Sequence, residues 1–148
     1  MLVLESTVLI AALDRARTSH QAVRDLLSSD AAKAVTSQTM RETLAVATRP
    51  LGANGLGIDF TNAWRSIYAM RMACNFLLLE NDKWWASYMA LTAQIQPNGR
   101  TIYDLGQVAH VHSLGKSARL LTDDGGICAR YKDYIDVITM SDYQQHKH

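Results

Sequence analysis

Cysteine is scarce in this chain, and the two cysteines that are present follow no recognised spacing. Cys74 and Cys128 lie in apolar surroundings, and neither belongs to a CxxC pattern or stands at a Cys/His spacing. The sequence therefore offers no thiolate metal site. Two reduced core thiols in a cytosolic protein fit this usage better than a disulfide does.

Long apolar runs and an excess of charge of either sign are also absent. No stretch approaches the roughly 18 to 20 apolar residues that cross a bilayer, so we expect no contact with a membrane. The N-terminus has no basic residues ahead of its apolar stretch and carries Glu5 inside it, so it does not read as a signal peptide and the cytoplasm is expected. The formal net charge of +1 gives no global basic field for nucleic acid, although a local basic surface remains open.

The length and composition predict one globular domain. The chain has 148 residues, of which 48% are hydrophobic and 20% are charged. This length suits a single core, and we expect the domain to cover residues 1–140, with a flexible tail over residues 141–148.

The opening residues predict a strand that leads directly into a helix. Residues 1–4 are apolar, as in a strand buried on both faces, and residues 8–13 are apolar again. Ser6 and Thr7 are good residues for a helix N-terminus. Glu5 is therefore expected at the carboxyl end of the strand, which is the edge where open parallel sheets bind ligands.

The rest of the chain alternates in the same way between strands and helices. Further strands are predicted at residues 33–36, 75–80, 118–122 and 135–139, with helical patterns before and after each of them. This alternation predicts an α/β fold, a Rossmann-like three-layer α/β/α sandwich around a parallel sheet of four to five strands. The glycine-rich residues 51–58 are expected to form a flexible connection. The stripe of Trp64, Ile67, Tyr68 and Met70 is expected in the core, and residues 75–80 are expected to form a buried strand.

Several carboxylates fall at strand ends or in the first turns of the predicted helices. They are Glu5, Glu42, Asp104 and Asp124, with Asp123 beside the last of these. Each has an ordinary explanation: Glu42 and Asp104 can complete capping boxes, the aspartate pair can form a turn, and Glu5 can be a solvated strand end.

Taken together, these acids indicate a metal site. A half-buried group of carboxylates repels itself unless protons or cations neutralise it. Oxygen ligands that carry several negative charges suit Mg²⁺ or Mn²⁺. Such a site can bind a phosphodiester and activate water.

Four segments in order resemble the acidic motifs of PIN-domain ribonucleases, and most closely those of the VapC-type toxins of bacterial toxin and antitoxin pairs. The resemblance covers almost the whole chain. The segments are residues 4–10 with Glu5, residues 37–50 with Glu42, residues 102–104 with Asp104, and residues 121–124 with Asp124.

The resemblance implies a metal-dependent endoribonuclease that cuts single-stranded or loop regions of RNA. It implies that Glu5, Glu42, Asp104 and Asp124 ligate Mg²⁺ or Mn²⁺ and that Thr122 supports the site. Asp123 is a further candidate ligand. It also implies a homodimer and a small antitoxin that inserts a segment near the acids. Basic residues expected to contact RNA phosphates are Arg41, Arg49 and Arg119.

The sequence departs from the family pattern at two places. The first motif normally carries aspartate, and Glu5 is longer by one methylene, which moves the carboxylate by about 1.5 Å against the narrow distances that Mg²⁺ demands. Gly126 and Ile127 stand where a further acid and a phenylalanine are common. An alternative function is therefore a catalytically weakened PIN-like module that binds RNA or protein.

Two other kinds of function fit the residues less well. His110 and His112 form an HxH pair, but residues two apart on a helix face different directions and cannot bind one ion together. A phospho-acceptor receiver domain would carry a lysine at the end of its fifth strand, where this chain has Thr139. Ser6 lacks the GxSxG setting of a hydrolase nucleophile.

Overall fold

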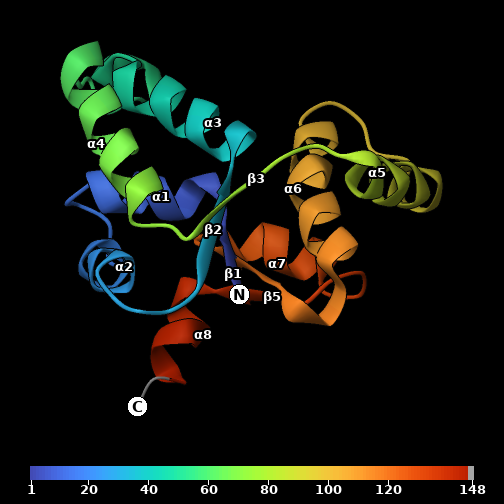
Figure 1. The fold of residues 1–148 in the computed structure, drawn as a ribbon. Helices are drawn as coiled ribbons and strands as arrows, with labels where there is room; N and C mark the ends of the chain where they lie inside the picture. Colours follow the sequence, from blue (N-terminus) through green and yellow to red (C-terminus); the bar gives the residue numbers. More distant parts are fainter. Residues whose placement is uncertain (147–148) are drawn as a thin grey trace.

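A sheet of five parallel strands forms the centre of the protein in the computed structural model, which describes residues 1–146 (Figure 1). The strand order is β3-β2-β1-β4-β5, which is the order of a Rossmann-like sheet. A receiver domain would have the order 2-1-3-4-5 and is excluded. The strands are β1 (Leu2–Leu4), β2 (Lys33–Thr36), β3 (Phe76–Leu78), β4 (Arg119–Thr122) and β5 (Val137–Thr139).

Helices cover both faces of the sheet, as Figure 1 shows with the blue to green helices on one side and the yellow to orange helices on the other. The predicted three-layer α/β/α sandwich is therefore confirmed. The α-helices are α1 (Ser6–Leu13), α2 (His20–Leu27), α3 (Ser37–Thr48), α4 (Phe60–Met72), α5 (Asp82–Ile95), α6 (Thr101–Leu114), α7 (Gly125–Tyr131) and α8 (Met140–Gln145), and short 3₁₀ turns lie at Leu51–Ala53 and Gly115–Ser117.

Neighbouring residues of each strand enter opposite halves of the core, because successive side chains of a strand point to opposite faces. Leu4 and Leu121, which are register partners, pack with α1, α2 and α4 on one face. Val3 and Leu120, also partners, pack with α5, α6 and α7 on the other. Both faces of β1 are thus buried, as its apolar sequence predicted.

The chain order of the strands reverses beside β1, and this position defines the expected ligand site. From β1 the chain runs outward to β2 and β3, and it then returns to the other side of β1 to form β4 and β5. In open α/β sheets, ligands bind outside the carboxyl ends of the strands at such a switch point. Glu5 directly follows β1, and residues 123 and 124 directly follow β4.

The stripe on α4 was expected in the core, which is confirmed for Ile67 and Met70 and wrong for Trp64 and Tyr68, and β3, which was expected to be a buried strand, is largely exposed. Trp64 and Tyr68 are 46% and 54% exposed, and Phe76 of β3 is 52% exposed. α4 buries its other face through Ala63, Ile67 and Met70. β3 is an edge strand of the sheet. Its apolar side chains, which would suit a central strand, are therefore partly exposed to solvent.

The glycine-rich segment after α3 is a hydrogen-bonded cap rather than an open connection. The backbone N–H groups of residues 56, 57 and 58 donate to carbonyls of residues 46, 49 and 47. A Cβ atom on Gly55 would lie 2.0 Å from the Arg49 carbonyl oxygen, so only glycine permits this close return of the chain.

At the C-terminal end, the chain continues beyond the predicted domain boundary as helix. Helix α8 covers Met140–Gln145 and begins at Thr139, whose hydroxyl accepts from the Asp142 N–H. The flexibility expected for residues 141–148 stays a prediction, and residues 147–148 lie outside the described part. No helix within residues 1–146 is both long and apolar enough to cross a membrane.

Candidate active site

A cavity of about 680 Å³ lies at the carboxyl ends of β1 and β4. The four acids singled out in the sequence all line it, and they come from four segments of the chain: the β1–α1 junction, α3, α6 and the β4–α7 junction. Glu5, Glu42, Asp104 and Asp124 thus line one and the same cavity.

Glu5 is buried and serves at the same time as the N-cap of α1. Its Oε2 accepts from the Thr7 N–H at 3.0 Å, from the Thr7 hydroxyl, and from the Thr122 hydroxyl at 3.2 Å. Its Oε1 accepts from the Ser6 hydroxyl at 2.6 Å. The longer side chain of glutamate bends back onto the N-terminus of α1. Its Oε2 already accepts the hydrogen bonds from Thr7 and Thr122, whereas its Oε1 can accept a further one.

Thr122 connects the ends of the two central strands. Its hydroxyl donates to Glu5 and accepts from the Asp124 N–H at 3.0 Å. The Asp124 carboxylate in turn caps α7 by accepting from the Gly126 N–H at 2.8 Å. Thr122 is fully buried, so its hydroxyl fixes the positions of both neighbouring acids.

Glu42 does not take part in a capping box. The N-cap of α3 is Thr36, whose hydroxyl accepts from the Thr39 N–H at 3.0 Å. The Glu42 carboxylate instead accepts from the Gln38 amide at 2.6 Å, and the same amide nitrogen donates to the Tyr103 carbonyl at 2.8 Å. Gln38 therefore joins α3 to the first turn of α6.

A glycine on α6 makes room for this link. A Cβ atom on Gly106 would come within 2.7 Å of the Gln38 side-chain oxygen. Any larger residue at position 106 would push Gln38 away from Glu42, because real Cβ atoms essentially never approach so closely. Sequence reasoning missed both Gln38 and Gly106.

Asp104 is half-buried and forms an ion pair inside the cavity. Its Oδ2 lies 3.3 Å from Nη1 of Arg130 on α7. Burial raises the pKa of the Asp104 carboxyl, the charge of Glu5 raises it further, and Arg130 and Arg100 lower it, while Glu42 adds a small increase. Glu5 and Glu42 thus lie close enough to Asp104 for their charges to raise its pKa.

Asp123 points away from the cavity. Its Oδ2 accepts from the Ser19 hydroxyl at 2.7 Å and lies 3.6 Å from Nη1 of Arg17. Asp123 is not among the residues that line the cavity. The structure therefore places it apart from the four acids with which the sequence grouped it.

The three arginines expected to contact RNA lie in different places. Arg49 lines the cavity, whereas Arg41 is an exposed residue of α3 that does not line it. Arg119 stands at the amino end of β4 and pairs with Asp136 at 2.7 Å. The cavity is also lined by Arg100 and Arg130, neither of which was among the three arginines expected to contact RNA.

The donor set of the cavity fits Mg²⁺ or Mn²⁺ in its chemistry. All four acids offer hard oxygen ligands, which these ions prefer. Within residues 1–146, however, no group of three or more His, Cys, Asp or Glu side chains is drawn together closely enough to hold a metal. Arg130 supplies the positive charge beside Asp104.

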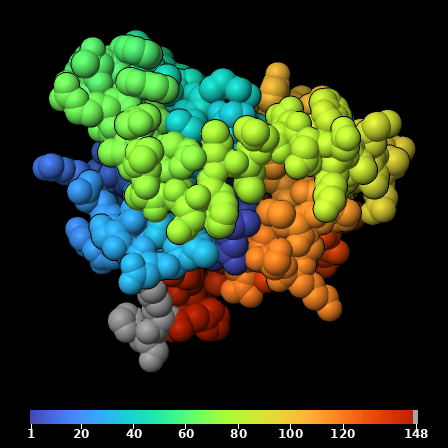
Figure 2. All heavy atoms as spheres, viewed as in Figure 1, coloured from blue at the N-terminus to red at the C-terminus, as the bar shows by residue number. Residues whose placement is uncertain are grey.

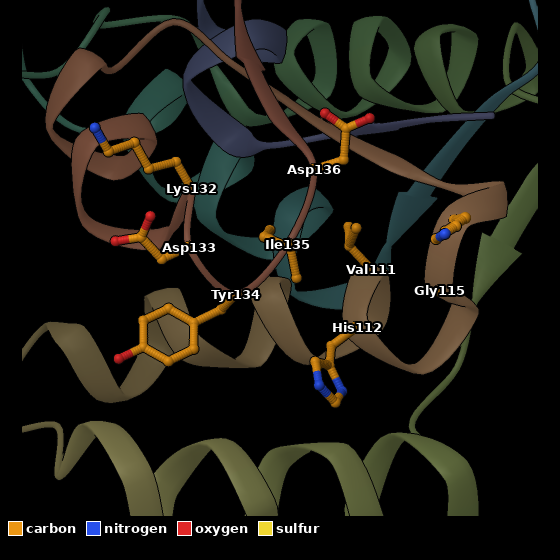
Figure 3. A pocket seen from close by; sticks show the side chains of 9 residues that line it. Val111, His112, Gly115, Lys132, Asp133, Tyr134, Ile135 and Asp136 are labelled. Carbon is orange, nitrogen blue, oxygen red and sulfur yellow. The ribbon is translucent and has the colours of Figure 1, made fainter.

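A second cavity, of about 540 Å³, lies at the opposite edge of the sheet (Figure 3). Its wall includes His112, Lys132 and Asp133, so charges of both signs surround it. His112 contacts the Ser87 hydroxyl through Nδ1 at 3.0 Å, while His110 is buried against Trp84. The HxH pair therefore faces two different surroundings, as expected from helix geometry.

Both cysteines are free, as expected. Cys74 is buried and Cys128 is half-buried. Burial raises the pKa of the Cys74 thiol to about 11, so at neutral pH it is a neutral apolar group of the core.

In structure, the chain is similar to toxin proteins from bacterial toxin and antitoxin complexes. A chain of VapBC-1 from nontypeable Haemophilus influenzae aligns with a TM-score of 0.66 at 17% identity, covering 95% of this chain and 98% of that one. DNA-bound VapBC from Salmonella typhimurium gives a TM-score of 0.69 at 14% identity, covering 94% and 97%. VapC20 from Mycobacterium tuberculosis, a sarcin-ricin loop cleaving toxin, gives 0.61 at 14% identity, covering 87% and 94%.

These similarities confirm the PIN-like fold that the sequence motifs implied. In the first two alignments, the aligned region spans nearly the whole of this chain and of the related chain. Neither a protein-family model nor a curated protein matches the sequence. At such low identities the structural similarity establishes the fold, while activity must be argued from the residues of the cavity.

Proposed function

We propose that this protein is a metal-dependent endoribonuclease of the VapC toxin type. The observation that carries the proposal is that four acidic residues, from four segments of the chain, line one cavity at the switch point of a PIN-like sheet. The structural similarity to a sarcin-ricin loop cleaving toxin supports RNA as the substrate. The residues proposed to hold Mg²⁺ or Mn²⁺ are Glu5, Glu42, Asp104 and Asp124.

The side chains of the cavity suit phosphodiester hydrolysis without a protein nucleophile. When bound, a divalent cation supplies a nucleophilic water and offsets negative charge on the phosphate. Thr122 orients Glu5 and the backbone before Asp124, and Gln38 holds Glu42. Arg49, which lines the cavity, is placed to bind the RNA backbone.

The direct test is cleavage of a mixed pool of structured RNAs by the purified protein. We expect cleavage with Mn²⁺ or Mg²⁺ and none after chelation by EDTA, because the carboxylates alone cannot activate water. Gel separation of end-labelled RNA measures the rate and the position of each cut. Restoring Mn²⁺ to the chelated sample should restore cleavage, which separates metal removal from irreversible damage.

Comparison with Glu5→Asp distinguishes an enzyme from a binding module. Cleavage by both forms supports the proposal, since both side chains can cap α1 and present an oxygen to the cavity. Cleavage by the aspartate form alone would identify a disabled enzyme. If neither form cuts RNA while both bind it, the protein is an RNA-binding module and the proposal is wrong.

We also propose an antitoxin partner and a homodimer. The related VapBC proteins were crystallised as toxin and antitoxin complexes, and the site is expected to work in the cytoplasm, where such pairs meet RNA. The surface that fits a second copy is an apolar face formed by α4, β3 and α5, which make one continuous band in Figure 2. Its exposed residues are Phe60, Trp64, Tyr68, Met72, Phe76, Leu77, Leu79, Trp85 and Met89.

Self-association through this apolar face follows from its size and position. Monomeric proteins rarely leave so many large apolar side chains exposed together. The face also includes the edge strand β3, whose outer side has no strand partner in the described sheet. A symmetric pair of copies would cover the same apolar face on each and bury both edges.

We expect light scattering after size exclusion to give about 33 kDa for the wild type, twice the chain mass of 16.5 kDa. The double variant Trp64→Glu/Met72→Glu should give the monomer mass, because it places two charges in a desolvated contact. Tyr134→Glu is the matched control: it changes a residue that is 39% exposed beside the second cavity. A wild-type monomer, or a dimer that survives the double change, contradicts the proposed contact.

A further inference from the structure

Arg130 places a positive charge inside the cavity of acids. It lies on α7, six residues after Asp124, and lines the cavity. Its Nη1 is 3.3 Å from Oδ2 of Asp104, and its guanidinium carbon is 5.8 Å from the centre of the Tyr131 ring. The side chain is 48% exposed. Arg130 is therefore held by one ion pair and by its contacts with Tyr131, while about half of its side chain remains exposed.

This ion pair occupies a carboxylate that the proposed function assigns to a metal ion. Arg49 and Arg100 also line the cavity, but among the described residues only Arg130 forms an ion pair with one of its acids. Coordination by Asp104 would bring a second cation beside the guanidinium, and the two cations would repel each other. The ion pair between Arg130 and Asp104 therefore competes with the binding of a metal ion to Asp104.

The Arg130 guanidinium has N–H donors that are not used in the pair with Asp104 and are available to another anion. Arginine carries five N–H donors in a planar fork, and Arg130 directs one nitrogen to Asp104. The fork matches the geometry of phosphate oxygens. An RNA backbone in the cavity would pass beside this side chain, because Arg130 and the acids line the same wall.

We propose that Arg130 is held on Asp104 in the metal-free protein, is released when Asp104 ligates a divalent cation, and then binds an RNA phosphate in the cavity. The proposal rests on the proposed nuclease function and adds a residue that couples metal binding to substrate binding. Arg130 would make metal binding weaker and RNA binding stronger, and the second effect would require the metal.

The first test is calorimetric titration of Mn²⁺ into the wild type, Arg130→Met and Arg119→Met. Arg119 is the matched control, because it is 45% exposed and forms an equivalent pair with Asp136 on the opposite edge of the sheet. A half-exposed ion pair contributes little, so Arg130→Met should bind Mn²⁺ about twofold to fivefold more tightly. Arg119→Met should match the wild type.

The second test is binding of a fluorescent single-stranded RNA, measured by anisotropy at low temperature over a time in which a gel shows the RNA intact. With Mn²⁺, Arg130→Met should bind RNA several times more weakly, and its salt dependence should fall by about 0.7 in log–log slope for one lost phosphate contact. With EDTA, the variant and the wild type should agree. Arg130→Lys, which keeps the charge without the fork, should lie between them.

The outcomes separate this proposal from the nuclease function. Mn²⁺ binding that is equal in wild type and Arg130→Met overturns the competition, while the nuclease function stands. RNA binding weakened equally with and without Mn²⁺ also overturns the release, since Arg130 would then be an ordinary phosphate contact. Absence of Mn²⁺ binding in every form, each shown to be folded by its thermal melt, overturns the nuclease function and this proposal with it.

Discussion

Replacing Asp104 by asparagine is expected to reduce RNA cleavage by a factor of about a hundred or more and to remove most Mn²⁺ binding. Asparagine has nearly the same shape, so the change removes charge rather than packing. Burial raises the pKa of the Asp104 carboxyl, and the charges of Glu5, Arg130, Arg100 and Glu42 also act on it, so Asp104 lies near two of the other acids of the cavity. The variant also leaves the Arg130 guanidinium without its anion.

Initial cleavage rates and Mn²⁺ calorimetry measure this effect, and Asp123→Asn is the control. Asp123 is the acid that sequence reasoning grouped with the metal ligands, but it lies against Ser19 and Arg17 outside the cavity. We expect Asp123→Asn to retain cleavage within a few fold of wild type. Equal losses in the two variants would mean that the cavity is not the reaction site.

Lowering the pH from 7 to 4 is expected to remove about 3 kcal/mol of folding stability through His110 alone. Burial lowers the pKa of this imidazole from 6.5 to about 4. The unfolded chain therefore takes up the proton first as the pH falls below about 6.5, and the folded state loses stability until the pH reaches about 4. The contribution is constant above that window.

Urea unfolding followed by tryptophan fluorescence, at several pH values, measures this loss. His110→Gln should flatten the pH dependence between 6.5 and 4 relative to wild type, because glutamine does not titrate. His112→Gln, a change at the exposed neighbour that contacts Ser87, should leave the pH dependence as it is in wild type. Equal pH dependence in the wild type and His110→Gln would show that the pKa of His110 in the folded protein is not lowered, which contradicts the prediction.

Sequence pattern predicted the strands and helices well, because local chemistry determines them. The apolar residues 1–4 predicted β1, and the apolar pattern of residues 8–13 predicted α1 directly after it. The carboxyl-edge argument then placed the acids, since every parallel strand delivers its next residue to the same edge. The strand order was not predicted, because it depends on which strands distant in the sequence pair with one another.

Contacts between distant side chains were beyond the sequence. The Arg130 pair with Asp104 joins residues 26 positions apart, and the Gln38 contact with Tyr103 joins residues 65 positions apart. Neither contact joins residues at a sequence spacing that would predict it. The exposure of Trp64 was also unpredictable, because an apolar stripe has the same pattern whether a sheet, another copy or solvent lies against it.

The cap at the start of α1 has a consequence for how this protein can change over time. A single carboxylate, Glu5, both begins that helix and borders the cavity of acids. A substitution at position 5 therefore affects both the stability of α1 and the chemistry of the cavity. Only residues that can cap the helix and also present an oxygen to the cavity are expected to be tolerated there. Inactivation by mutation would more easily arise at Glu42, where the helix does not depend on the side chain.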